Sequence, residues 1–380
     1  MNTSSEINLS SSPHSFLKAN TTHTMLFVII ALLPLCVKGV FLYGLSAFLV
    51  ILTSVVSCVV SEALFQLATK RKIRVKDCSA IVTGLLLALV CPPTVPLWQV
   101  ALGGIFAIIV AKEFFGGIGA NVFNPALAGR AFMFVSFPTT MGATWLTPEK
   151  ASAINYVEAT SAATSAATSA ATSAATSAAT SAATSAATSA ATSAATGAVS
   201  AATGVATEPV VEKVVDAISS STLLSRIGEA ELTTQNYWDF FFGNRAGCIG
   251  ESSILLILIA FVFLSVTRII DWKTPLTMVA TVAIATLIAG GDVLMSVMAG
   301  GLLFGAVFMI TDYATTPVTM WGRIIFAFGC GLITFLIRQF GGYPEGVMFS
   351  ILIMNAVAPF LNRFVPRKYG YGKEKKAGTK

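Results

Sequence analysis

The sequence predicts an all-α, polytopic membrane protein with about ten transmembrane helices, some of them broken or half helices, and one long external loop. Of the 380 residues, 55% are hydrophobic and only 11% are charged. The mean hydropathy is +0.78. Both values are typical of chains that face lipid rather than water over most of their length.

Ten apolar runs locate the expected helices. A membrane-spanning helix needs about 20 predominantly apolar residues. Several runs are short or interrupted by Gly and Pro, which a membrane tolerates only where protein or a cavity shields the backbone. We assign residues 24–137 to a first transmembrane half and residues 252–362 to a second. The runs lie near 25–41, 44–68, 78–91, 96–112, 121–137, 252–270, 274–290, 292–310, 323–340 and 345–362.

The positions of Lys and Arg predict the orientation, because short cytosolic loops are rich in these residues. The loops near 92–98, 290–292 and 341–345 contain neither. We therefore expect a cytosolic arm (1–23), a cytosolic basic tail (363–380) and an external loop (138–251). This orientation also explains the formal net charge of +6, so no nucleic-acid partner is expected, only membrane lipid and protein. The basic residues on the cytosolic side are Lys70, Arg71, Lys72, Arg74, Lys76, Arg268, Lys273, Arg363, Arg367, Lys368, Lys373, Lys375, Lys376 and Lys380.

The external loop contains nine consecutive TSAA tetrads that begin at Thr160, followed by degenerate copies to about Ala206. A four-residue period drifts around a helix of 3.6 residues per turn, and the repeat offers no large apolar side chain to bury. We therefore expect a spacer without fixed structure.

Polar residues at or near membrane depth are the candidate functional residues, because such residues are costly in lipid and are usually paired. Simpler interpretations stay open: helix capping for Asp77, interfacial anchoring for Lys112 and Glu113, and interhelical hydrogen bonding for Asn121 and Asn124. The spacing of the two asparagines predicts one helical face. The candidates are Asp77, Ser79, Thr83, Lys112, Glu113, Asn121, Asn124, Arg130, Asp292, Asp312, Thr315, Thr316 and Asn355.

Metal binding and residue-based catalysis are not expected. The six cysteines are scattered singly without a CxxC pair, and both histidines, His14 and His23, lie in the predicted arm. No catalytic triad, phosphate-binding loop or zinc motif occurs in a suitable context.

The segment SAIVTGLLLALVCPPTVPLWQVALGGIFAIIVAKEFFGGIGANVFNPALAGRAF, Ser79 to Phe132, resembles the NqrB/RnfD family. This family includes RnfD, the D subunit of the Rnf electron-transport complex, and the B subunit of the sodium-pumping NADH:quinone oxidoreductase. The resemblance is stronger to the Rnf member and covers nearly the whole chain except about residues 142–213.

The resemblance implies a ten-helix scaffold with two flavins, riboflavin within the membrane and FMN joined by a phosphoester to a threonine on the outer side. The attachment pattern of the family resembles Asp-x-x-Ser-Gly-Ala-Thr, which corresponds here to Asp216, Ser219 and Thr222, with serines in place of Gly and Ala. The repeat offers an alternative at Thr164, preceded by Glu158 instead of aspartate.

The resemblance also implies that Asn121 and Asn124 lie near riboflavin, and that Asp77 occupies the place of an acidic residue tied to sodium uptake; Asp292 and Asp312 are weaker candidates. It implies a translocase subunit of the bacterial inner membrane that carries electrons through FMN and riboflavin, coupled to Na⁺ or H⁺ transport. The implied partners are the other Rnf-type subunits (A, B, C, E and G) and a flavin transferase.

The ion and the electron donor and acceptor stay open at this point. A channel or carrier for ions or small solutes, without a redox cofactor, is the alternative, because broken helices with polar residues near the midplane also suit transport. A scaffold that displays the TSAA spacer at the surface is a third possibility.

Overall fold

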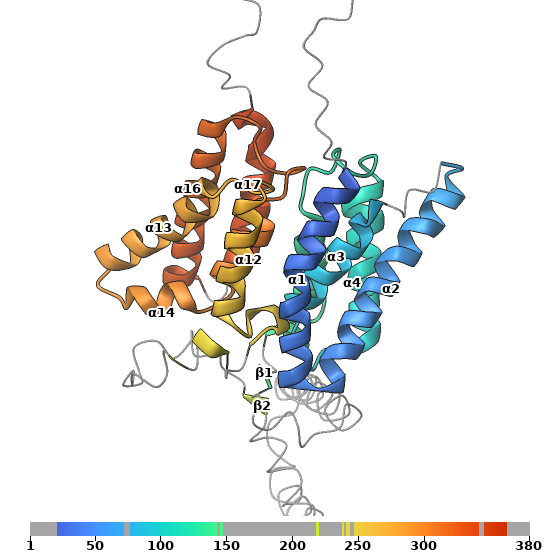
Figure 1. Ribbon diagram of the computed structural model, residues 1–380, viewed down its shortest axis with the longest axis horizontal. Helices are drawn as coiled ribbons and strands as arrows, with labels where there is room; N and C mark the ends of the chain where they lie inside the picture. Colours follow the sequence, from blue (N-terminus) through green and yellow to red (C-terminus); the bar gives the residue numbers. More distant parts are fainter. Residues whose placement is uncertain are drawn as a thin grey trace, which may run out of the picture.

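The computed structural model describes residues 21–71, 77–142, 145–146, 218–219, 238, 241–243, 247–341 and 346–362. This part of the chain is built from helices (Figure 1), which confirms the predicted all-α class. Three of its helices are long and apolar enough to cross a membrane: α1 (Thr21–Tyr43), α2 (Leu45–Ala68) and α16 (Met320–Phe340). The TSAA repeat, Thr164, Asp216 and Thr222 lie outside the described residues.

The first half contains a helix at each of its five predicted runs. After α1 and α2 come α3 (Ser79–Leu89), α4 (Leu97–Ile108) with its π-helical extension η2 (Ile109–Glu113), and α5 (Pro125–Ser136). Helix α2 packs against α3 and α4, and α4 packs against α5. Helix α1 begins at Thr21, within the last three residues of the predicted arm, 1–23.

The second half contains the other five runs. The 3₁₀ turn η4 (Ile249–Glu251) leads into α12 (Ile254–Val266), followed by α13 (Lys273–Ile288), α16 and α17 (Val347–Leu361). The predicted run 292–310 is broken into α14 (Val293–Met298), α15 (Leu302–Phe304) and the π-helix η5 (Gly305–Met309). Gly300 and Gly301, at φ of 67° and 65°, make the break between α14 and α15.

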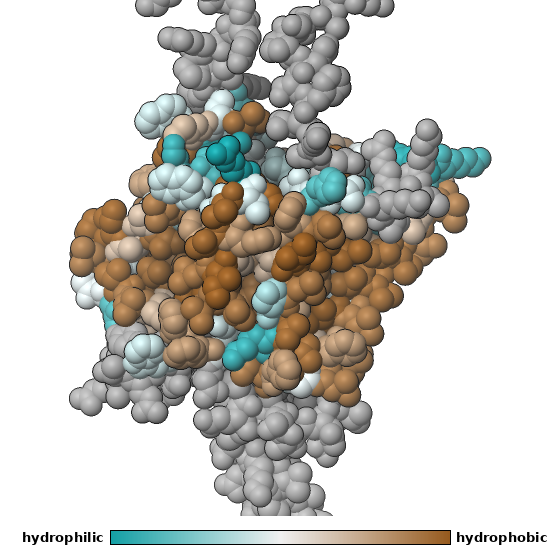
Figure 2. Space-filling view, in the orientation of Figure 1, coloured by the Kyte–Doolittle hydropathy of each residue, from teal (hydrophilic) through white to brown (hydrophobic). Residues whose placement is uncertain are grey.

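The surface of the bundle is apolar around its middle (Figure 2). Phe41, Ile288 and Phe340 are each at least 80% exposed. A monomer in water rarely exposes such a wide apolar surface, whereas a lipid bilayer covers it without cost. The described residues therefore form a membrane-embedded bundle.

The two ends of the bundle differ. Helix α1 begins and α17 ends at the same end, the upper one in Figure 1. At the opposite end, β1 (Trp145–Leu146) pairs antiparallel with β2 (Ile218–Ser219), with Trp145 opposite Ser219. The sequence did not predict this small sheet. It joins the two sides of the long loop and keeps the backbone of Ser219 at the end opposite the start of α1.

Helices α2 and α3 approach each other closely at Gly84. A Cβ atom added at Gly84 would lie 2.7 Å from the Cα of Val55, and the hydroxyl of Ser54 donates a hydrogen bond of 2.7 Å to the Gly84 carbonyl. Small residues allow this kind of backbone approach in membrane bundles.

We expect Gly84→Ala to destabilise the bundle by about 1–3 kcal/mol, because the new methyl group overlaps the backbone of α2. The measurement is the melting temperature of the detergent-solubilised chain by fluorescence-detected size exclusion. Gly247→Ala is the control, since its Cβ would meet a Glu251 side-chain oxygen at an ordinary 3.6 Å. Equal melting temperatures for the two variants would contradict the close packing.

Candidate functional site

A cavity of about 380 Å³ lies between the two halves of the bundle, at the end where α1 begins. Helices α1, α3 and α5 of the first half and α12 and η5 of the second half contribute to its walls. Just over half of the lining residues are apolar, and the other ten are polar or charged. The polar and charged residues of the lining are Thr21, Thr24, Ser79, Thr83, Lys112, Asn121, Asn124, Thr311, Asp312 and Tyr313.

Both π-helices end beside this cavity. Lys112 lies near the end of η2, and Thr311 and Asp312 follow η5 closely. The π-helical turns of proteins occur frequently at functional sites, because they displace side chains and free backbone groups. The cavity is therefore bounded by the least regular backbone of the described helices.

Asn124 connects the two halves at the cavity. Its side-chain oxygen caps α5 by accepting hydrogen bonds from the N–H groups of Ala126 (3.1 Å) and Leu127 (3.3 Å). Its amide nitrogen is 3.5 Å from the carbonyl of Met309 in η5. One buried side chain thus fixes the start of α5 and its distance from the second half.

The prediction that Asn121 and Asn124 share a helical face is wrong. Helix α5 begins only at Pro125, and Asn121 lies in irregular backbone, where its amide nitrogen donates to the carbonyl of Phe123 at 3.2 Å. Proline favours the first position of a helix, and the residue before it avoids helical geometry. Both asparagines nevertheless line the same cavity.

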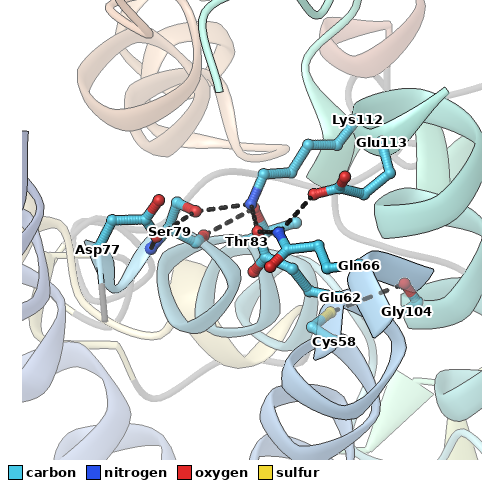
Figure 3. A network of polar contacts seen from close by, with 9 residues as sticks. All are labelled: Cys58, Glu62, Gln66, Asp77, Ser79, Thr83, Gly104, Lys112 and Glu113. Carbon is cyan, nitrogen blue, oxygen red and sulfur yellow. Dashed lines mark hydrogen bonds and ion pairs between the residues drawn. The ribbon is translucent and has the colours of Figure 1, made fainter. Parts of the chain in front are cut away.

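Next to the cavity, six polar residues form a hydrogen-bonded group that we call the buried polar cluster: Glu62, Gln66, Asp77, Ser79, Lys112 and Glu113 (Figure 3). The Lys112 ammonium lies 2.7 Å from Glu62 Oε1 and 2.6 Å from Ser79 Oγ. The Lys112 and Glu62 side chains are only 3% and 2% exposed. This is a buried ion pair between α2 and η2.

The rest of the cluster extends the ion pair in two directions. Gln66 donates from its amide nitrogen to carboxylate oxygens of Glu62 (3.3 Å) and Glu113 (3.1 Å). On the other side, Ser79 donates to Asp77 Oδ1 at 3.0 Å. Ser79 and Lys112 belong both to the cluster and to the cavity wall, so the two sites share a boundary.

The cluster has a formal excess of negative charge. Its three carboxylates face one ammonium group, a formal charge of −2. Glu62 Oε2 is buried and has no hydrogen-bond partner among the described residues. A buried carboxylate oxygen without a partner is unfavourable, and a proton or a bound cation would relieve it.

Two interpretations from the sequence change here. Lys112 and Glu113 are not interfacial anchors, because both are buried and hydrogen-bonded in the cluster. Glu62 and Gln66 were missed altogether. The available signal was the four-residue spacing of Ser54, Cys58, Glu62 and Gln66 within an apolar run, which places these buried residues on one face of α2.

Among the remaining candidate residues from the sequence, Asp312 lines the cavity, whereas Asp292 and Arg130 do not. Burial raises the pKa of Asp312, while hydrogen bonds from the Ala314 N–H and the Thr315 hydroxyl act in the opposite direction. Asp292 is instead the N-cap of α14. Arg130 is buried with a guanidinium nitrogen 3.5 Å from Cys248 Sγ.

No group of His, Cys, Asp and Glu suited to holding a metal ion occurs within the described ranges. Of the expected FMN-attachment segment, only the backbone of Ile218 and Ser219 is described. Thr222 and Asp216 therefore stay predictions.

Comparisons with known proteins cover nearly the whole chain. The model of the NQR2, RnfD, RnfE family matches residues 8–370. The D subunit of the Na⁺-translocating ferredoxin:NAD⁺ oxidoreductase complex of Acetobacterium woodii is 36% identical over 377 residues, 98% of each chain. The D subunit of the proton-translocating ferredoxin:NAD⁺ oxidoreductase complex of Clostridium ljungdahlii is 36% identical over 370 residues, covering 95% of this chain and 96% of that protein. The D subunit of the ion-translocating oxidoreductase complex of Stutzerimonas stutzeri is 34% identical, covering 93% of each chain.

We expect Lys112→Met to lower the free energy of unfolding by about 3–5 kcal/mol, because it leaves the Glu62 carboxylate buried without its counter-ion. The double variant Lys112→Met with Glu62→Met should recover most of this loss. Arg323→Met, which breaks a partly exposed ion pair with Asp271, should cost no more than about 1 kcal/mol. Thermal melting of the purified chain measures all three; a double variant as unstable as the single one would contradict the pairing.

Proposed function

Because the chain belongs to the NQR2, RnfD, RnfE family, we propose that it is the RnfD-type membrane subunit of an ion-translocating oxidoreductase complex. In this proposal, the subunit passes electrons through covalent FMN and bound riboflavin. The electron transfer is coupled to the transport of Na⁺ or H⁺. Two of the relatives named above are such subunits of complexes that use ferredoxin and NAD⁺. The observation that carries the proposal is the cavity at the junction of the two halves, with both asparagines in its wall.

The residues of this cavity fit riboflavin. A volume of about 380 Å³ lies within the range of roughly 300–1,000 Å³ that is common for pockets that hold organic ligands. Val82, Leu86 and Phe308 offer apolar surface to a ring system, and the amides of Asn121 and Asn124 offer donors and acceptors to its polar edge. A bound flavin supplies reversible electron transfer, and the protein supplies position, burial and electrostatics.

In this proposal, some side chains position the flavin and others supply charge beside it. Asn124 is held by its own cap and by its contact with Met309, so it presents a fixed amide. Lys112 places a cationic group in the wall, where its ion pair with Glu62 orients it. The apolar lining limits the access of water to the ring position.

For FMN we propose Thr222 as the attachment residue, with Asp216 and Ser219 as part of its recognition pattern. The backbone of Ser219 pairs with Trp145 at the end of the bundle opposite the cavity. Thr164 is the alternative.

For ion transport we propose the buried polar cluster as part of the pathway, with Asp77 at one edge. Its negative formal charge suits either a proton or Na⁺, as does the Glu62 oxygen that has no partner among the described residues. The two relatives named as translocating Na⁺ and protons are equally similar to this chain, so the ion stays open.

The proposed location is the bacterial inner membrane, with both termini in the cytosol. Lys70, Arg71 and Arg268 lie in the connections at the cavity end and Lys273 begins α13 there, and the distribution of basic residues assigns this end to the cytosol. The A, B, C, E and G subunits of the complex and a flavin transferase are the proposed partners. A carrier without a redox cofactor is the alternative that the following experiments address.

We expect the purified chain, co-expressed with a flavin transferase, to show flavin fluorescence in a denaturing gel, and Thr222→Val to abolish it. Thr164→Val is the matched control and should stay fluorescent. The reverse result would assign the attachment to the repeat, and a wild-type chain without fluorescence would favour the carrier.

We expect Asn121→Ala to lower the non-covalent riboflavin of the purified complex about tenfold, because roughly 1.4 kcal/mol of binding energy corresponds to a factor of ten. Riboflavin is measured by chromatography after denaturing extraction. Gln99→Ala is the control, since it removes a buried amide that contacts Thr140 outside the cavity. Equal riboflavin contents would contradict the assignment of the cavity.

A further inference from the structure

A second hollow, which we call the side recess, adjoins the cavity and has a volume of about 230 Å³. It shares Ile269, Ile270, Thr311 and Tyr313 with the cavity wall, so these four residues lie between the two spaces or border both. Its other lining residues are mostly polar. They are Asp271, Thr274, Thr316, Val318 and Arg323.

The hydroxyl groups of the side recess are placed to accept hydrogen bonds. Thr311 donates to the carbonyl of Val307 at 2.6 Å, and Thr316 donates to the carbonyl of Asp312. Each hydroxyl has one hydrogen to donate and two lone pairs. Because the hydrogens are already used, the oxygens are best satisfied by a ligand that donates, such as an alcohol.

Apart from Asp271, the charged and dipolar groups of the side recess are positive and would attract an anion. The guanidinium of Arg323 lies there, held by a hydrogen bond from its Nε to the Pro317 carbonyl at 3.0 Å. The first turn of α13, which begins at Lys273 and runs for 16 residues, adds the positive end of a helix dipole. A helix N-terminus beside an arginine is a common arrangement for phosphate binding.

The carboxylate of Asp271 occupies this anion-binding position between Arg323 and the start of α13. Its Oδ1 accepts a hydrogen bond from the Lys273 N–H at 3.4 Å, and its Oδ2 lies 3.6 Å from Arg323 Nη1. The Lys273 ammonium is directed elsewhere, toward Met320 Sδ at 3.8 Å and the Trp272 ring. A carboxylate of the protein thus takes the position of the anion, and a phosphate entering the recess would meet a like charge.

We propose that the side recess receives the ribityl chain of riboflavin, and that Asp271 excludes FMN from the cavity by occupying the position of its phosphate. This inference rests on the proposed riboflavin site and assigns its specificity. The uncharged chain can donate its hydroxyls to Asp271, Thr311 and Thr316, while the ring lies in the apolar cavity. Such selectivity comes from repulsion of the competing ligand as much as from attraction of the correct one.

The first test is Asp271→Asn in the purified complex. The ratio of FMN to riboflavin in the non-covalent flavin, measured by chromatography after denaturing extraction, should rise about tenfold, because a like charge a few ångströms from the phosphate is removed. Asparagine keeps the hydrogen bond to the start of α13. Asp292→Asn, the same change at the N-cap of α14, should leave the ratio unchanged.

The second test uses complex from which the non-covalent flavin has been removed. Wild-type complex should bind riboflavin at least about tenfold more tightly than lumiflavin, which has a methyl group in place of the ribityl chain. Thr316→Val should weaken riboflavin binding about fivefold and leave lumiflavin binding unchanged, because only the chain reaches the recess. If the Asp271→Asn variant does not assemble, this test still decides whether the ribityl chain lies in the side recess.

The outcomes separate this inference from the proposed function. Wild-type complex without any non-covalent flavin would refute the riboflavin site itself. Riboflavin in the wild type, together with an unchanged ratio in Asp271→Asn and equal affinities for riboflavin and lumiflavin, would leave that site standing and overturn the role of the side recess.

Discussion

The ion pair between Lys112 and Glu62 is the interaction on which the rest of this site depends. Both side chains are almost completely buried, and their charged atoms are 2.7 Å apart. In an apolar interior, neither charge is tolerable without the other, so the pair fixes η2 against α2 and, through Ser79, against the start of α3. Of these elements, η2 and α3 contribute to the cavity wall, and all three contribute to the buried polar cluster.

The fold could be predicted because its main determinant is local. Each of the ten apolar runs contains helix, and even the break in the run 292–310 was visible as paired glycines. The start of α5 and the carboxylate of Glu62 were not predicted, because the mean hydropathy of a segment does not resolve single residues. Pro125 marked the true start of α5, but hydropathy alone moved it to residue 121. Glu62 escaped notice because one carboxylate barely changes the mean hydropathy of α2.

The site was predictable only in part, because its contacts join distant residues. The two asparagines were found as polar residues in an apolar stretch, yet the contact of Asn124 with Met309 joins positions 185 residues apart and leaves no local pattern. The same holds for the pairing of β1 with β2 across the long loop. The link between Lys112 and Glu62 likewise crosses 50 residues, so each appeared alone in the sequence as an anchor or an isolated charge.

Under the proposed function, the shared wall of cavity and cluster gives a physical reason for coupling electron transfer to ion movement. Charges inside a low-dielectric bundle are screened far less than charges in water, so a unit of negative charge gained in the cavity acts directly on Lys112. The cluster already has more carboxylates than cations, and it would lose part of its compensation if a reduced flavin drew Lys112 toward the cavity. Uptake of a proton or cation at Glu62 would then restore the balance.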